Sequence, residues 1–238
     1  LSPHIIDMIA QELSPEEKIR INMANESILT DGSIYTLTVN GRDLASNDSE
    51  TIIVSNILYD ITPPSFSSIK PDSGSALNHQ RITYSVSEDL FKGEVIWMQT
   101  GGTDDPDAPH KVQFEGSELK FGDHNDITLL NMPQLADGGR YTIYFTGRDR
   151  AGNIADTVVV RDILYDFTSP KILVSYPTPN LITNSTDVSY SLSEALFRGD
   201  FSWKRIGGVE DTLAPYSADL IPKEMKKGEF SRVQLTNI

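Results

Sequence analysis

Short segments in which apolar and polar residues alternate make up most of the chain, and turn residues separate them at close intervals. Residues 81–86 alternate in this way, which is the pattern of a strand with one buried face. Residues 141–146 and 157–165 are rich in the aromatic and β-branched residues that favour strands. The same criteria predict further strands over residues 66–69, 94–98 and 127–130. Six or seven strands within about 100 residues, without a convincing helix, indicate a β-sandwich.

The strand pattern recurs with a constant offset of 106 positions, which is the signature of a tandem repeat. Tyr35 and Tyr141 are separated by this interval, and so are Trp97 and Trp203. Longer matches at the same offset are Gly41–Asp43 with Gly147–Asp149, Ile57–Asp60 with Ile163–Asp166, and Leu90-Phe91 with Leu196-Phe197.

The segments after Asp60 and Asp166 both contain proline, which cannot donate to a sheet ladder and so interrupts strands. We place the boundaries between repeats there. We therefore expect the C-terminal part of a repeat in residues 1–61, a complete repeat in residues 62–167, and the N-terminal part of a third in residues 168–238.

Two local features indicate an immunoglobulin-like core. Residues 135–141 have the pattern of a tyrosine corner, in which a Tyr that opens a late strand bonds back to the preceding turn, and residues 29–35 repeat this pattern. Trp97 takes the place of the central aromatic residue of such a sandwich. Residues 5–13 have the spacing of an amphipathic helix, but the aligned residues 111–115 predict a strand, so we expect strand or coil.

Two motifs end the middle repeat: Asp149-Arg-Ala-Gly-Asn153, and Tyr165-Asp-Phe-Thr-Ser-Pro170. With them the chain resembles the tandem bacterial immunoglobulin-like repeats of large cell-surface proteins and adhesins. The first repeat departs from the motif at Ser46, where the turn has Gly. The resemblance implies an all-β chain of tandem immunoglobulin-like β-sandwich repeats of about 106 residues, located at the cell surface or outside the cell. It also implies a structural role as a stalk, adhesin or filament.

Composition and motifs exclude several other functions. The 238 residues carry a net charge of −14, so the chain repels nucleic acid and anionic lipid. It has no Cys, which excludes disulfides, thiol catalysis and Cys-based zinc sites. No apolar run approaches the roughly 18 residues of a membrane span. The sequence contains no Gly-x-Ser-x-Gly, no His-Glu-x-x-His and no phosphate-binding Gly loop, so we expect no enzyme activity.

Of the four His, only His4 and His110 align in the repeat, and Tyr216 takes their place in the third copy. Tyr does not replace His as a general base or metal ligand. We therefore expect His110 to pack or to form a hydrogen bond.

Acidic residues hold the same positions near the expected joints between repeats. The resemblance implies Ca²⁺ at such joints, where carboxylates and backbone carbonyls supply the six to eight oxygens that this ion takes. The candidate ligands are Asp43, Asp60, Glu88, Asp149, Asp166 and Glu194. The alternative is structural: Asp149 would stabilise its own turn by bonding backbone amides, and Asp166 would cap a strand end.

The expected partners are neighbouring repeats of the same chain or neighbouring copies. Residues 168–238 lack the last two strands of a repeat, and residues 35–60 are that pair in phase. Either the chain is a window from a longer one, or the front of one molecule completes the back of the next. The alternative functions are a module that binds a host or surface glycan or protein through residues 103–109 and 209–215, and an accessory domain of a secreted hydrolase.

Overall fold

The protein is described by a computed structural model, which covers residues 4–8 and 29–233. These residues are all-β, with several small sheets, one short 3₁₀ helix (η1, Gly116–Leu119) and no α-helix. The chain divides into two compact units, unit 1 (Leu1–Asp166) and unit 2 (Phe167–Ile238). The finer division into three repeats stays a prediction. Of the segment 5–13, residues 5–8 are coil, and residues 9–13 lie outside the described part.

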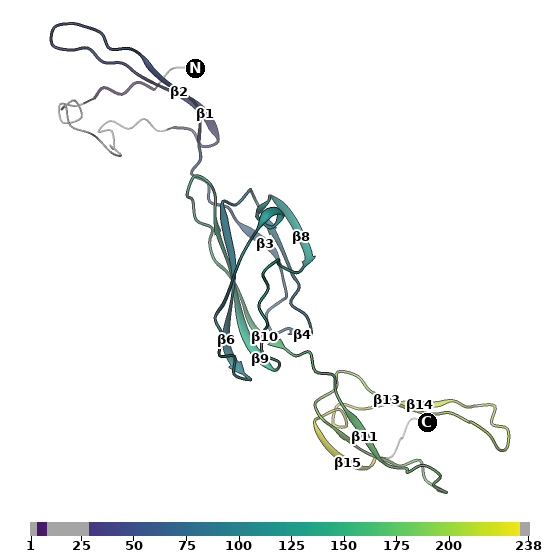
Figure 1. The fold of residues 1–238 in the computed structure, drawn as a ribbon. Helices are drawn as coiled ribbons and strands as arrows, with labels where there is room; N and C mark the ends of the chain where they lie inside the picture. The colour runs from purple at the N-terminus through teal and green to yellow at the C-terminus, as the bar shows by residue number, and fades with distance from the viewer. Residues whose placement is uncertain (1–3, 9–28, 234–238) are drawn as a thin grey trace. The chain divides into compact units, whose positions relative to one another are not determined.

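Two sheets of unit 1 enclose its main core (Figure 1). The first sheet has the order β4-β10-β9-β6-β7, with β4 at Ala76–Leu77, β6 at Lys92–Gly102, β7 at His110–Gln113, β9 at Gly139–Arg148 and β10 at Val158–Tyr165. The second has the order β3-β5-β8, with β3 at Phe66–Lys70, β5 at Ile82–Val86 and β8 at Gly122–Ile127. All neighbours are antiparallel except β4 and β10.

The core of unit 1 follows from the alternation of apolar residues along its strands. On β5 the buried residues are Ile82, Tyr84 and Val86, and on β9 they are Tyr141, Ile143 and Phe145. Trp97 on β6 is fully buried and meets the ring of Tyr141 edge-to-face, with the ring centroids 6.1 Å apart. The prediction of a central Trp is therefore confirmed. Burial of each such side chain contributes roughly 1.5–3 kcal/mol.

Most of the predicted strands are confirmed to within a few residues, but the strand at residues 127–130 is wrong. That strand, β8, comes earlier and ends at Ile127. Its sequence is mostly polar because β8 pairs with β5 at one edge of its sheet and buries little of its own surface. Leu129 is buried from the loop that follows, which accounts for the apolar signal.

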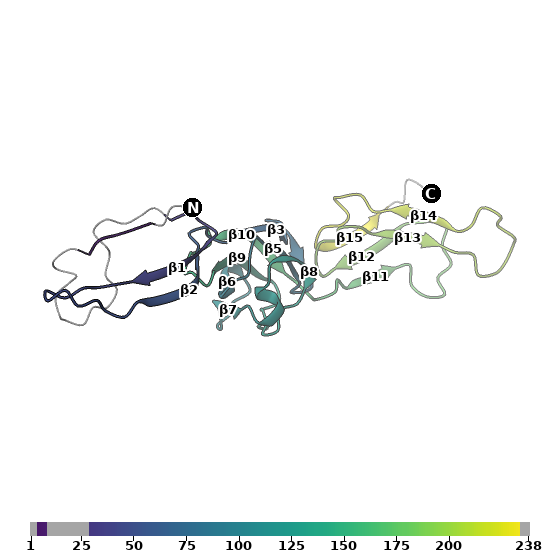
Figure 2. The same ribbon diagram turned by 90° about the horizontal axis from the view of Figure 1, so that it is seen from above.

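A separate hairpin and a smaller set of strands form the rest of the described chain. β1 (Ser33–Val39) and β2 (Ile52–Tyr59) pair antiparallel and run side by side in both views (Figure 2). In unit 2, one sheet has the order β11-β12-β15, with β11 at Ile172–Tyr176, β12 at Val188–Leu192 and β15 at Gly228–Val233. The other holds β13 (Asp200–Trp203) and β14 (Tyr216–Asp219).

Residues 106 positions apart, called counterparts below, share strand bounds and positive φ at many positions of the described chain. The bounds of β2, β3, β5, β7 and β8 recur in β10, β11, β12, β14 and β15. Residues with positive φ also occur as counterparts: Gly32 and Gly138, Ser46 and Gly152, Asn56 and Asp162, Gly74 and Asn180, Gly102 and Gly208, Gly122 and Gly228, Asp126 and Arg232. Several pairs differ in residue type, so the geometry recurs even where the residue does not.

Candidate metal site at the joint after β2

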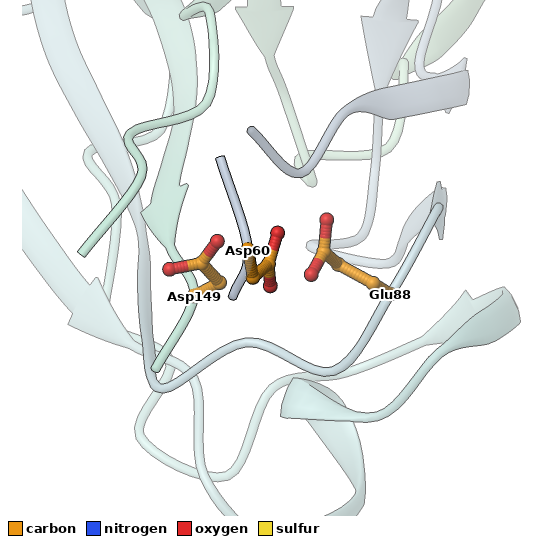
Figure 3. Close-up of side chains that lie close together, drawn as sticks. All are labelled: Asp60, Glu88 and Asp149. Atoms are coloured by element: carbon orange, nitrogen blue, oxygen red, sulfur yellow. The ribbon is translucent and has the colours of Figure 1, made fainter. Parts of the chain in front are cut away.

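Three carboxylates from distant parts of unit 1 come together where β2 leads into β3. Asp60 directly follows β2, Glu88 lies two residues after β5, and Asp149 directly follows β9. One oxygen of each lies within 4.8 Å of the others. Figure 3 shows the three side chains facing a common space, with Asp60 between the other two. The structure therefore brings together three of the six predicted ligands.

Asp149 also organises the turn that it opens. Its Oδ1 accepts hydrogen bonds from the backbone amides of Gly152 (2.6 Å) and Asn153 (2.9 Å), and its Oδ2 accepts one from the Asn153 side chain (2.7 Å). Gly152 has a φ of +103°, a conformation that favours glycine. Asp149 is only 2% exposed. The structural role proposed for Asp149 is confirmed, and its role as a metal ligand stays a prediction.

The same turn is tied to the segment that follows β2. The Asn153 side-chain amide donates to the backbone carbonyl of Asp60 at 3.1 Å. The carboxylate of Asp60 in turn accepts the amide of Thr62, also at 3.1 Å. The Asn153 side chain thus positions the backbone of Asp60, which lies 93 residues earlier in the sequence.

Asp31 is a fourth acid of this joint, and it is not among the six ligands predicted from the sequence. It lies just before β1, and its carboxylate accepts hydrogen bonds from the Ile61 amide (2.8 Å) and the Thr62 hydroxyl. These hydrogen bonds lower the pKa of Asp31, and the bond from Thr62 has the largest effect. The available signal was the recurrence of Asp31-Gly32 as Asp137-Gly138.

The surroundings of Glu88 disfavour its ionised form. Partial burial raises the pKa of Glu88, and the negative charges of Asp60, Asp149 and Asp31 raise it further. Among the described residues, no Lys or Arg forms an ion pair with Asp60, Glu88 or Asp149. Clustered carboxylate oxygens without a basic partner are suited to a hard divalent cation.

The other three predicted ligands lie outside this cluster. Asp43 closes a turn of its own, where it accepts the backbone amide and the side-chain amide of Asn47, both at 2.8 Å. This is the counterpart of the turn from Asp149 to Asn153. Asp166 is the last residue of unit 1, and Glu194 belongs to unit 2. They are the counterparts of Asp60 and Glu88, and their role as ligands stays a prediction.

A second polar cluster is buried beside Trp97 and confirms two local predictions. The Tyr141 hydroxyl accepts the Ala136 amide at 2.9 Å, which is the predicted tyrosine corner, and donates to Oδ2 of Asp105. His110 Nε2 lies 2.8 Å from the same oxygen, so His110 forms the expected hydrogen bond. Burial opposes ionisation of Asp105, but hydrogen bonds from Tyr141 and His110 outweigh it and lower its pKa.

Comparisons with models of known protein families and with curated proteins find no match for this chain. Among the described residues, no helix is long and apolar enough to cross a membrane. The function is therefore inferred from the geometry and from the sequence motifs.

Proposed function

We propose that this chain is part of an extended extracellular or cell-surface protein, in which tandem immunoglobulin-like β-sandwich repeats form a stalk, adhesin or filament without catalysis. The observation that carries the proposal is the recurrence of strand bounds and positive-φ residues at a spacing of 106 residues. In such an array each repeat contacts its neighbours, and stability is approximately a sum over repeats and joints.

The joint after β2 supports this function because it is held by specific contacts. Asp31 bonds the linker at Ile61 and Thr62, and Asn153 bonds the carbonyl of Asp60. Pro63 and Pro64 follow directly, and proline restricts the conformations of a linker. A joint with these contacts is suited to transmit force along a chain of sandwiches.

We propose further that the joint binds Ca²⁺ through Asp60, Glu88 and Asp149. The donor set fits, because Ca²⁺ prefers carboxylate oxygens and tolerates irregular geometry. Asp149 already accepts three hydrogen bonds, yet a carboxylate has about four lone-pair positions, so it retains capacity for a cation. Burial and then the charges of Asp60, Asp149 and Asp31 raise the pKa of Glu88, and bound Ca²⁺ would neutralise those charges and stiffen the joint.

The test is thermal unfolding of the full chain with EDTA and with Ca²⁺. At a free concentration of about 100 times Kd, Ca²⁺ should stabilise the folded joint by about 2.7 kcal/mol. We expect Glu88→Gln to raise Tm in EDTA, because it removes a repelled charge, and to reduce the gain in Tm that Ca²⁺ produces. Glu50→Gln is the matched control, since Glu50 is exposed in the β1–β2 loop and its loss changes net charge equally.

An equal Tm in EDTA and in Ca²⁺ would exclude the calcium site and leave the structural role of the turn. A calcium response that Glu88→Gln and Glu50→Gln reduce equally would place the ion elsewhere on the acidic surface.

A second function, a binding module for a glycan or protein, is favoured by one observation in unit 2. A cavity of about 390 Å³ lies beside the predicted variable segment at residues 209–215. Its lining includes Trp203, Arg205, Asp211 and Tyr216, a combination of aromatic and charged groups that suits sugar recognition. Titration calorimetry of the full chain with oligosaccharides, compared with Asp211→Asn, would detect such binding.

A further inference from the structure

Arg148, the last residue of β9, and its counterpart Arg42 lie in turns with the same backbone pairing. Arg42 forms an isolated β-bridge with Asp48, and Arg148 forms the equivalent bridge with Ile154. A backbone hydrogen bond also recurs, from Ser49 to Gly41 at 2.8 Å and from Ala155 to Gly147 at 2.9 Å. The side chain opposite each arginine is therefore a main difference between the two turns.

The turn after β1 shows which group this arginine position binds. Arg42 donates to both carboxylate oxygens of Asp48, from Nε to Oδ1 at 2.6 Å and from Nη2 to Oδ2 at 3.1 Å. In the turn after β9 the counterpart of Asp48 is Ile154, which is 68% exposed and offers no acid. Among the described residues, Arg148 forms no ion pair. Its guanidinium therefore lacks the carboxylate that Arg42 has.

Phe91 and Lys92 complete a cationic surface at this end of the sheet. The Cζ atom of Arg148 lies 5.5 Å from the centroid of the Phe91 ring, a cation–π contact that positions the guanidinium. Lys92, on β6, lies directly opposite Arg148 in the register of the two strands, and no ion pair of Lys92 is found in the described part of the chain. Like charges at opposed positions destabilise a sheet, so an anion between Lys92 and Arg148 would remove this repulsion.

A hollow of about 250 Å³ lies beside these two cations. Its lining includes Lys92, Glu94, Gln113, Thr146, Arg148 and Ile154. The Glu94 carboxylate accepts a hydrogen bond from the Gln113 side-chain amide at 2.6 Å, and its remaining lone pairs can accept a hydroxyl. The Thr146 hydroxyl can both donate and accept. The hollow thus combines two cations with groups that bind hydroxyls and with one apolar side chain.

We propose that this hollow binds one acidic sugar unit of a glycan, such as a hexuronic acid, whose carboxylate takes the place that Asp48 has beside Arg42. The carboxylate pairs with Arg148 and Lys92, and the sugar hydroxyls bond Glu94 and Thr146. Glu94 distinguishes between possible carboxylate ligands, because it repels an acidic peptide and accepts a hydroxyl from a sugar. The volume is below the roughly 300–1,000 Å³ of sites for drug-sized ligands, which suits a single ring.

The site is separate from the calcium cluster and from the cavity of unit 2. Pairing of a carboxylate with Arg148 and Lys92 needs no Ca²⁺, so binding is measured in EDTA. The chain carries a net charge of −14, but at physiological salt charges more than about 8 Å away are largely screened. The two nearby cations therefore have the largest influence on an acidic ligand in the hollow.

NMR titration of the ¹⁵N-labelled full chain with methyl glucuronide tests the proposal, with methyl glucoside as the neutral sugar of the same shape. We expect saturable shifts of the amides that line the hollow, with a Kd on the order of 1 mM for methyl glucuronide. Methyl glucoside should bind at least about tenfold more weakly, because it has no carboxylate for Arg148.

Substitutions at two positions identify the carboxylate contact. Arg148→Gln should weaken binding at least about tenfold, while Arg161→Gln, at an exposed position of β10, removes the same charge and should leave Kd unchanged. Ile154→Asp should weaken binding as much as Arg148→Gln does, because it supplies the internal carboxylate seen beside Arg42. Ile154→Asn introduces a side chain of the same size without the charge and should change Kd by less than about threefold.

Three results would overturn the proposal. The first is an equal Kd for methyl glucuronide and methyl glucoside, and the second is an equal Kd for Ile154→Asp and Ile154→Asn. The third is a shift of amides around Trp203 in place of those around the hollow, which would assign the sugar to the cavity of unit 2. Binding of the tripeptide Gly-Glu-Gly as tightly as methyl glucuronide would contradict the choice of a sugar.

Discussion

The hairpins β9–β10 and β1–β2 are counterparts with the same antiparallel pairing and opposite exposure. Ile143, Val160 and Ile163 of β9–β10 are 0%, 5% and 0% exposed, against 51%, 46% and 37% for Leu37, Val54 and Ile57 of β1–β2. Both hairpins have a register shift at the same place. It lies between Val160 and Ile163 in β10 and between their counterparts Val54 and Ile57 in β2. Burial is therefore a property of the sheets around a hairpin and not of the hairpin itself.

The two tyrosine corners share their local hydrogen bond but differ in their tertiary contacts. The Ala136 amide bonds the Tyr141 hydroxyl at 2.9 Å, and the Thr30 amide bonds the Tyr35 hydroxyl at 2.8 Å. Only Tyr141 also bonds a buried carboxylate and packs on a Trp. The corner forms from nearby residues alone, whereas the contacts beyond it need the rest of the sandwich.

Truncation of Trp97 and Trp203 should give the largest difference in the loss of unfolding free energy, because Trp97 is fully buried and Trp203 is partly exposed. Trp97→Ala should destabilise unit 1 by about 3–5 kcal/mol, because it leaves a cavity in a closed core. Trp203→Ala should cost unit 2 clearly less, because Trp203 is already partly exposed. Residue-resolved hydrogen exchange in the full chain measures both. Equal costs would mean that the core of unit 2 is as closed as that of unit 1.

Removal of the two tyrosine hydroxyls should give a smaller difference. Tyr141→Phe removes the hydroxyl that donates to the buried carboxylate of Asp105 and accepts the Ala136 amide, at a cost of about 1–3 kcal/mol. Tyr35→Phe removes one exposed hydrogen bond and should cost less than about 1 kcal/mol. Urea denaturation of both variants is the measurement, with Tyr144→Phe as control. A loss for Tyr35→Phe that matches that for Tyr141→Phe would contradict the distinction between the corners.

The smallest expected effects concern the pH dependence of stability, which should have opposite directions for Asp43 in the β1–β2 loop and for Glu88 in the joint. Hydrogen bonds from Asn47 lower the pKa of Asp43 below its ordinary 3.8, so this stabilisation is present above pH 3.8 and is lost as pH falls through the lowered value. The pKa of Glu88 is raised above 4.5, so its contribution favours folding below pH 4.5 and is lost as pH rises through the raised value. Carboxyl chemical shifts followed by NMR in EDTA should show both directions. A pKa of Glu88 below 4.5 would contradict the repulsion in the joint.

Much of the fold was predictable because it depends on short-range patterns. Alternation and enrichment in aromatic and β-branched residues located β5, β6, β9 and β10, and the offset of 106 residues identified which segments are counterparts. β8 was misplaced because its sequence is polar, while the apolar Leu129 is buried from a loop.

The candidate site was predictable only in part. Recurrence selected acids near the joint, but it could not show that Asp60, Glu88 and Asp149 meet while Asp43 closes its own turn. Asp31 was missed because its role depends on bonds to residues 30 and 31 positions away. Contacts at such separations depend on how the sheets assemble, which local pattern does not encode.

The central claim is that Asp60, Glu88 and Asp149 bind Ca²⁺ at the joint after β2. Thermal unfolding of the wild type, Glu88→Gln and Glu50→Gln in EDTA and in Ca²⁺ tests it most directly. We predict that Ca²⁺ raises the Tm of the wild type and of Glu50→Gln, and raises the Tm of Glu88→Gln by less. A Tm of the wild type that is equal in EDTA and in Ca²⁺ would contradict the account.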